Sequence, residues 1–213
     1  MPLSITDTVM ASSRIVVDLV LSAPVRDRWR DESACEGMTV GGLAHHTAAQ
    51  LDHLVTLYAA APDESAPISA LEHYRRAAWA NTGLDDEANV AIRTGSDEQA
   101  VGGPDELAPR SARALEALPA ALGGVEDDDA VLIPWQGWSL TAHDLAVTRL
   151  MEMVVHADDL AASVSVATPE FPVDAVRLVV DLLAGIAVDR HGQVAVVRAL
   201  SRPQRAPRSV SAF

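Results

Sequence analysis

The sequence predicts an all-α protein built on a four-helix bundle, with a small hairpin or ordered loop before its most informative helix and an extra C-terminal helix. The 213 residues are 49% hydrophobic but only 4% aromatic, so the core must consist of Ala, Val and Leu, which suit closely packed helices. Most of the chain repeats apolar residues at helical spacing between capping residues and Pro or Gly breaks. One segment, 130–140, instead favours two short strands around a turn.

Caps and breaks set the expected helix boundaries. Ser, Thr and Asp side chains cap helix starts, and Pro or Gly ends helices. Helices are therefore expected from Ser4 or Thr6 to about Leu21, from Thr39 to Pro62, from Ser69 onward with an interruption at 81–86, over 105–122, from Thr141 to Pro169, and over 173–191, followed by a short helix led by Gly192. We expect residues 1–168 to form the bundle and residues 169–213 to form a helical extension packed on it.

Charge and cysteine content narrow the function classes. The chain has 16 basic and 30 acidic residues, a net charge of −14, which disfavours binding to nucleic acid or to an anionic membrane. Its single cysteine, Cys35, can form neither an internal disulfide nor a cysteine-based zinc site, and with no obvious activating base beside it in the sequence it is interpreted as an incidental thiol. Without a signal-like N-terminus or a long apolar run, a cytoplasmic protein is expected.

The helix expected from Thr141 carries a polar stripe. Positions Arg149, Glu152, His156 and Asp159 share one side of a helical wheel, and apolar residues cover much of the remainder. A central helix cannot leave such groups unpaired without a cost of roughly several kcal/mol. Glu152 and His156 are four residues apart, so both can reach one ion, although such pairs also occur as ordinary hydrogen-bonded partners.

The helix expected from Thr39 contains three histidines, any of which could be a third metal ligand. The wheel places His46 on the flank of the buried face, His45 nearly opposite in solvent, and His53 at the rim. Two imidazoles and one carboxylate with an open fourth position are typical of a catalytic zinc site. His46, Glu152 and His156 are therefore the predicted ligands of a divalent metal, with zinc favoured.

Two segments of the sequence, RWRDESACEGMTVGGLAHHTAAQ and RLMEMVVHADDLAAS, resemble the signatures of a known family. The first is similar to the start of the first metal-binding helix of the mycothiol-dependent maleylpyruvate isomerase family, and the second is similar to that family's second signature. The resemblance implies a DinB-like bundle whose N-terminal domain binds zinc through His46, Glu152 and His156. Met38 stands where the family usually has Trp, and the chain ends before the family's separate C-terminal lobe. Because that lobe supplies substrate contacts, maleylpyruvate is not the expected substrate.

The resemblance also implies mycothiol as cosubstrate, whose sulfur would become a thiolate beside the metal. Such a thiolate serves either an isomerase or a thiol S-transferase acting on a small electrophile. Arg149 is expected to hold a substrate carboxylate, or else to form a buried ion pair with Glu152 or Asp159. Asp159 is expected to orient a ligand imidazole, although polarity near the helix end would explain it equally well.

Two other interpretations remain open at this stage. One is a non-catalytic bundle in which the metal is a structural clamp or part of a ligand sensor, and the other is a metal-dependent hydrolase, which is disfavoured because no second carboxylate base stands out. The expected partners are a small thiol and a small electrophilic substrate, with neither nucleic acid nor membrane. Self-association into a homodimer is compatible with this interpretation.

Overall fold

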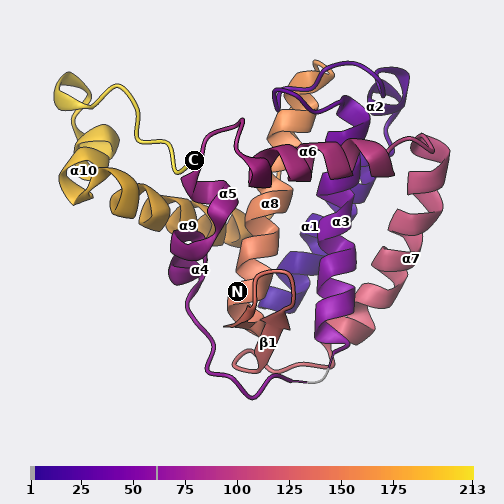
Figure 1. The fold of residues 1–213 in the computed structure, drawn as a ribbon, viewed down its shortest axis with the longest axis horizontal. Coiled ribbons are helices and arrows are strands. Elements are labelled where there is room, and N and C mark those ends of the chain that lie inside the picture. Colours follow the sequence, from indigo (N-terminus) through magenta and orange to yellow (C-terminus); the bar gives the residue numbers. More distant parts are fainter. Residues whose placement is uncertain (1–2, 61) are drawn as a thin grey trace.

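The computed structural model describes residues 3–60 and 62–213, and within them the protein is mostly helical, as predicted (Figure 1). Only one small sheet of two strands occurs in these residues. The elements are α1 (Ile5–Val20), α2 (Ala23–Asp27), α3 (Val40–Tyr58), α4 (Ala70–Arg76), α5 (Ala78–Asn81), α6 (Glu87–Gln99), α7 (Pro104–Leu122), β1 (Ala130–Ile133), β2 (Trp138–Thr141), α8 (Ala142–Ser163), α9 (Val173–His191), α10 (Gln193–Ser201) and a 3-10 turn, Pro203–Arg205.

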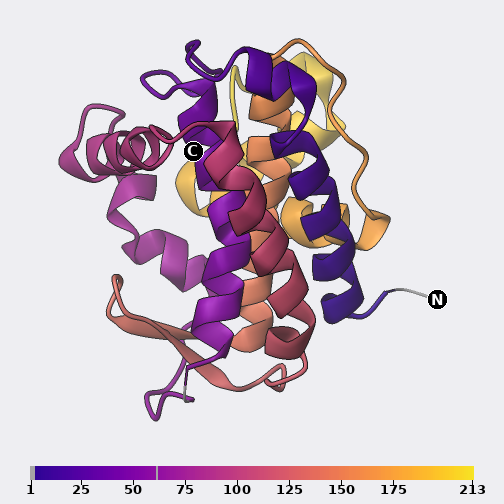
Figure 2. The ribbon, with the colours of Figure 1, turned by 90° about the vertical axis from the view of Figure 1, so that its right-hand side faces the viewer.

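Helices α1, α3, α7 and α8 form the predicted four-helix bundle. Helix α3 packs against both α7 and α8, and α1 contacts all three of the others. The four helices lie side by side in Figure 2, while α6 crosses the face of α3 in Figure 1. Helix α3 therefore has neighbours on more than one side, which matters for the histidines it carries.

The predicted N-caps are confirmed. Thr39 Oγ1 accepts the Gly42 N–H at the start of α3, and Thr141 Oγ1 accepts the Asp144 N–H at the start of α8. At α1 the cap is Ser4, the first of the two residues proposed from the sequence. Each such cap contributes about 1 kcal/mol by satisfying an amide that the helix cannot.

The core of the bundle is aliphatic, as the composition required. Leucines from α3, α7 and α8 are completely or almost completely removed from solvent, and each contributes roughly 1.5–3 kcal/mol through the burial of its side chain. They include Leu43, Leu51, Leu54, Leu118, Leu145, Leu150 and Leu160. No helix among the described residues has both the length and the hydropathy needed to cross a membrane.

The segment 130–141 forms the small hairpin that the sequence predicted. Strands β1 and β2 pair antiparallel, with Ala130 opposite Thr141. The connector between α3 and α4 runs alongside the hairpin. The Asp63 N–H donates to the Ala130 carbonyl at 2.9 Å, and the Ile68 N–H donates to the Ser139 carbonyl at 2.8 Å. The hairpin, which lies between α7 and α8 in the sequence, is therefore hydrogen-bonded to the segment that follows α3.

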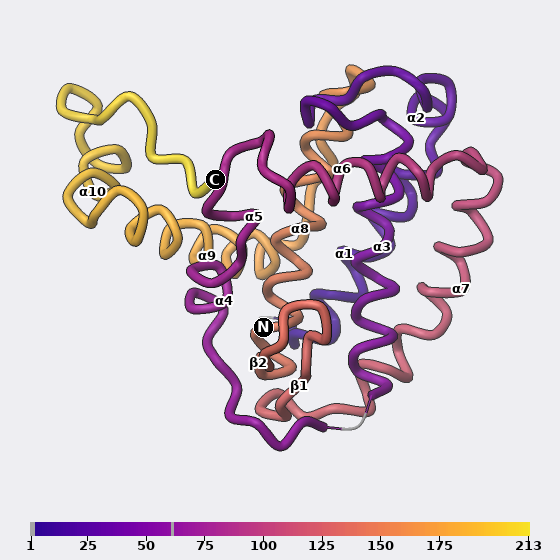
Figure 3. Tube along the Cα trace, viewed as in Figure 1, coloured from indigo at the N-terminus to yellow at the C-terminus, as the bar shows by residue number. Residues whose placement is uncertain are grey.

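The C-terminal segment contains α9 and the shorter α10, which begins directly after Gly192 as the sequence suggested. Helix α9 packs on α8, α1 and α4, and α10 packs on α9, so the pair projects from the bundle (Figure 1). The chain then returns toward α5 (Figure 3). Its last ring, Phe213, lies 5.3 Å from Trp79 and 5.7 Å from Tyr74, measured between ring centroids.

Candidate metal centre

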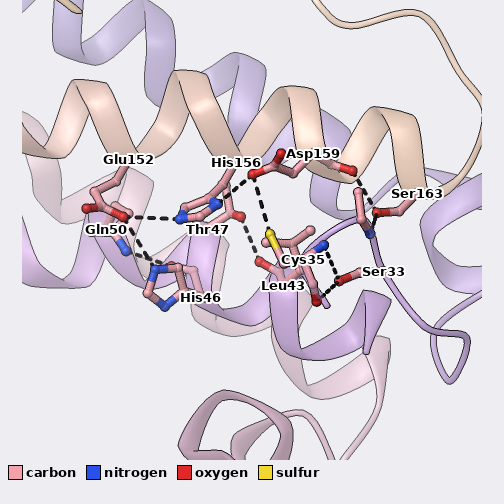
Figure 4. Close-up of polar contacts among 11 residues, drawn as sticks. Ser33, Cys35, Leu43, His46, Thr47, Gln50, Glu152, His156, Asp159 and Ser163 are labelled. Atoms are coloured by element: carbon pink, nitrogen blue, oxygen red, sulfur yellow. Dashed lines mark hydrogen bonds and ion pairs between the residues drawn. The ribbon is translucent and has the colours of Figure 1, made fainter. Parts of the chain in front are cut away.

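Three side chains from α3 and α8 converge at the middle of the bundle (Figure 4). His46 Nε2 lies 3.5 Å from Glu152 Oε2, and His156 Nε2 lies 3.2 Å from the same oxygen. The two imidazole rings are nearly perpendicular, with centroids 5.0 Å apart. The structure thus brings together the three residues proposed from the sequence as metal ligands, with one donor atom of each within 4.8 Å of the others.

The surrounding contacts fix these side chains in place. Glu152 and His156 stand one turn apart on α8, and His46 faces them from α3. Tyr58 Oη donates to the Ala142 carbonyl at 2.6 Å, which ties the end of α3 to the start of α8. The side chain of Glu152 is 9% exposed, whereas those of both histidines are 22% exposed. The cluster is therefore open to solvent on the imidazole side.

The donor set and its spacing fit a zinc ion. With ligand bonds of about 2.0–2.2 Å, two donors of a tetrahedral zinc site lie about 3.3 Å apart. The measured separations of 3.2 and 3.5 Å bracket that value. Two neutral imidazole nitrogens and one carboxylate oxygen leave one tetrahedral position for an exogenous ligand.

Electrostatics favour a carboxylate at the centre of this cluster. Burial raises the pKa of Glu152, but hydrogen bonds from His156 and His46 outweigh burial and hold that pKa well below its usual range. Burial lowers the pKa of His156, whereas its hydrogen bond to Asp159 raises that pKa well above the ordinary value. Without a cation, a proton on the imidazole balances the buried carboxylate, and a cation can take over that role.

Asp159 lies where an imidazole-orienting residue is needed. Its Oδ2 is 3.0 Å from His156 Nδ1, the ring nitrogen that faces away from Glu152. A carboxylate at this nitrogen holds the proton there and directs the Nε2 lone pair toward an ion. The adjacent Asp158 behaves differently, since its carboxylate is exposed and accepts the Thr168 hydroxyl at 2.5 Å.

Arg149 is buried one turn before Glu152 and pairs with neutral groups. Its NH1 donates to Gln50 Oε1 at 2.7 Å, and its Nε lies 3.3 Å from Thr148 Oγ1. Among the described residues no carboxylate forms an ion pair with it, so the alternative of a buried ion pair with Glu152 or Asp159 is wrong. Gln50, whose contact with Arg149 the sequence did not reveal, occupies that place.

The predicted solvent exposure of His45 is wrong. This residue is only 6% exposed, and its Nε2 lies 2.7 Å from Arg110 NH1 on α7. The helical wheel assumed one buried face for α3, whereas α7 packs on α3 in addition to α8. Burial, followed by the Arg110 charge, lowers the pKa of His45 to about 4, so the imidazole is neutral at pH 7.

His53 is half-buried, which is compatible with the rim position expected from the sequence. Its ring packs against Trp135 with centroids 5.1 Å apart, and its Nδ1 is buried with no hydrogen-bond partner among the described residues. Burial, then the Arg149 charge, lowers its pKa to about 4. His53 is not part of the three-residue metal cluster.

Comparison with known proteins identifies a matching family and a similar fold. The sequence profile described as the mycothiol maleylpyruvate isomerase N-terminal domain matches residues 10–161, a range that includes all three candidate ligands. Among solved structures, the chain is similar to the crystal structure of a histidine-to-alanine mutant of the mycothiol-dependent maleylpyruvate isomerase. The TM-score is 0.51 at 20% identity, covering 86% of this chain and 68% of that one, which supports a common fold. None of the curated proteins matches the chain.

Proposed function

Because the chain belongs to the mycothiol maleylpyruvate isomerase N-terminal domain family, we propose that it is a metal-dependent enzyme that uses a low-molecular-weight thiol such as mycothiol. Zinc is the proposed metal, and the reaction is either an isomerisation or the transfer of the thiol to a small electrophile. The observation that carries this proposal is the convergence of His46, Glu152 and His156 from two helices onto one point.

In this proposal the three clustered residues hold the ion, and each has a separate contribution. Glu152 supplies the negative charge, and the imidazoles of His46 and His156 supply neutral nitrogen ligands. A bound divalent cation would lower the pKa of a coordinated thiol, so that mycothiol would be present as the thiolate at neutral pH. The exposed side of the imidazoles gives the thiol a route of approach.

Asp159 is proposed to act through His156 rather than on the substrate. By accepting the hydrogen on His156 Nδ1, it keeps the Nε2 lone pair free and the ring in a fixed orientation. Its role in the activity is thus to position a ligand.

Arg149 is proposed to bind an anionic group of the electrophilic substrate. The only partners of its guanidinium among the described residues are uncharged, so its charge is not neutralised by a direct carboxylate contact. A substrate carboxylate could accept two hydrogen bonds from the guanidinium. This assigns the electrophile to the class of small unsaturated or oxo acids.

The organisation into two parts is also proposed. Residues 1–168 would contain all the groups named above, and residues 169–213 would support α8 from outside the bundle through α9. The extension would thus contribute to stability and contain none of the proposed metal ligands.

The test is to measure zinc content and mycothiol binding for the wild-type chain and for His156→Ala. We expect stoichiometric zinc and thiol binding in the wild type and the loss of both in the variant. His143→Ala, on the first turn of the same helix, is the control and should retain both. Stoichiometric zinc in His156→Ala would overturn the metal assignment, and zinc binding without thiol binding in the wild type would favour the non-catalytic bundle.

A further inference from the structure

A second group of metal-ligating side chains lies on the far side of His156. Cys35 Sγ is 3.4 Å from Asp159 Oδ2, and the same oxygen is 3.0 Å from His156 Nδ1 (Figure 4). One donor atom from each of the three residues lies within 4.8 Å of the other two. These donors are distinct from those of the first cluster, which uses the opposite ring nitrogen, Nε2.

The loop that carries Cys35 is held in place by the end of α8. The Ala34 N–H donates to Ser163 Oγ at 2.8 Å, and the Ser163 hydroxyl donates to the Asp159 carbonyl at 2.6 Å. Within the loop, Ser33 Oγ accepts the Cys35 N–H and donates to the Cys35 carbonyl, both at 3.1 Å. The thiol is thus presented to Asp159 by a hydrogen-bonded loop that is fixed to the helix bearing the other two donors.

The spacing is close to that of a tetrahedral ion. With metal bonds of about 2.3 Å to sulfur and about 2.0–2.1 Å to nitrogen and oxygen, the expected donor separations are about 3.6 Å for sulfur to oxygen and about 3.3 Å for nitrogen to oxygen. The measured 3.4 and 3.0 Å are shorter by only a few tenths of an ångström. A small outward movement of three side chains would therefore accommodate an ion.

We propose that Cys35, His156 and Asp159 form a second cation-binding site, selective for thiophilic divalent ions, with His156 shared between the two sites. A thiolate ligand favours soft or borderline cations such as zinc, cobalt and cadmium over magnesium and calcium. On binding, the Cys35 thiol releases its proton to solvent, and the sulfur and the carboxylate together balance the two charges of the ion. When His156 Nε2 also holds an ion, the Nδ1 proton leaves as well and the ring bridges the two ions as an imidazolate.

The second group, like the imidazole side of the first, is partly accessible to solvent. The Asp159 side chain is 31% exposed and Cys35 is half-buried, while Glu152 at the first cluster is buried. An ion can reach the second site without opening the bundle.

The experiment uses Co²⁺ as the probe on the metal-stripped full chain. We expect two cobalt ions per chain and a thiolate-to-cobalt charge-transfer band in the near ultraviolet. Cys35→Ser should bind one cobalt ion and lack the band. One cobalt ion and no such band in the wild type, or a band that survives in Cys35→Ser, would overturn the proposal and leave Cys35 as a hydrogen-bond donor to Asp159.

A second variant separates this inference from the proposed function. His46→Ala removes a ligand of the first cluster only, so the charge-transfer band should persist while the total falls to one ion. If the wild type binds only one cobalt ion and still shows the charge-transfer band, the result would count against the proposed function and not against the second site. If His46→Ala loses the band while its thermal unfolding matches that of the wild type, the second site does not bind cobalt independently of the first cluster, and the proposal is wrong.

A further measurement does not depend on spectra. Cys35 is the single cysteine of the chain, so its alkylation rate can be followed without ambiguity. Saturating Cd²⁺ should slow alkylation at least about 10-fold in both the wild type and His46→Ala, because a coordinated thiolate is a poor nucleophile. An unchanged rate in both proteins would contradict the proposal.

Discussion

The two sides of α3 carry adjacent histidines with opposite surroundings. On the side facing α8, His46 meets the carboxylate of Glu152 at 3.5 Å. On the side facing α7, His45 meets the guanidinium of Arg110 at 2.7 Å. Arg110 is in turn paired with Asp52 at 2.6 Å. Both imidazoles lie against a helix neighbour, so burial does not separate a candidate ligand from a structural histidine.

The charge of the nearest group distinguishes the candidate ligand His46 from the structural His45. Beside a carboxylate, an imidazole and a cation can share one negative charge, whereas beside a guanidinium the imidazole can only accept a hydrogen bond, and a second cation is repelled. This difference predicts which substitutions should affect metal binding and which should affect only the fold.

The largest expected effect is that of the matched pair His46→Ala and His45→Ala. Loss of His46 removes a proposed direct ligand, so zinc affinity at the first cluster should fall by more than about 100-fold, which is more than the effect of residues outside the ligand set. His45→Ala should keep wild-type affinity. Competition with a chelator of known affinity measures both, and an equal loss in the two variants would break the comparison.

The buried histidines outside the candidate metal cluster should be visible in the pH dependence of stability. His45, His53 and His73 each have a pKa lowered, chiefly by burial, to about 4 from the ordinary 6.5. Between those values the unfolded chain binds more protons than the folded one, so the free energy of unfolding should decrease as the pH falls from about 6.5 to about 4. For the well-buried His73 the loss is at most about 3 kcal/mol, at 1.36 kcal/mol per pKa unit.

For His45 the effect is smaller than for His73, because its charged neighbours Arg110 and Asp52 remain partly in solvent. Urea unfolding at a series of pH values would measure these slopes in the wild type and in His45→Gln and His73→Gln. Replacing the half-exposed His143 by Gln is the control. Equal slopes in all four proteins would show that the buried histidines are protonated in the folded state.

A third test compares the carboxylates on the two sides. Asp159→Asn should weaken zinc binding about 10- to 100-fold while leaving one ion bound at the first cluster, because Asp159 is proposed to orient His156 without being a ligand of that cluster. Asp52→Asn, which alters the His45 side, should leave zinc affinity unchanged. Isothermal titration with zinc gives both values, and an effect of Asp52→Asn as large as that of Asp159→Asn would contradict the assignment.

The smallest expected effect is that of Thr39→Ala, which removes the N-cap of α3, the helix that carries both His45 and His46. The free energy of unfolding should fall by about 1 kcal/mol, since the Gly42 amide loses its acceptor. Zinc stoichiometry should be unchanged, because the rest of α3 keeps His46 in place. Denaturant unfolding combined with metal analysis is the measurement, and zinc loss at unchanged stability would show that the first turn positions the ligand directly.

Much of the fold was predictable because its signals are local. Thr39 and Thr141 cap their helices as their positions before apolar repeats indicated, and the hairpin follows from strand-favouring residues around a Pro-to-Gly turn. The polar stripe on α8 was equally local, since Glu152 and His156 differ by one helical turn. His46 could be chosen from the helical wheel because it lies on the flank of the face that carries the buried Leu43, Leu51 and Leu54.

The features that the sequence did not predict depend on contacts between segments that are distant in the sequence, which no local pattern encodes. His45 is buried because α7 packs on a second side of α3, and a wheel drawn for one helix with one buried face cannot show a second neighbour. Cys35 reaches Asp159 across 124 residues of sequence, through the path of a loop without helical periodicity. Predicting the hydrogen bond between Arg149 and Gln50 would likewise have required knowing how α3 and α8 are shifted along their axes relative to each other.

The direct passage from β2 to α8 limits how the sequence can change in length. Thr141 both ends the strand and caps the helix, with no spacer between them. One residue inserted immediately after Thr141 would turn the rest of α8 by about 100° and carry Glu152 and His156 away from His46. The same insertion in the exposed turn at 126–128 would be absorbed before the strand begins. Tolerance to insertions and deletions should therefore change abruptly across a dozen residues, a property that a library of single-residue insertions would map directly.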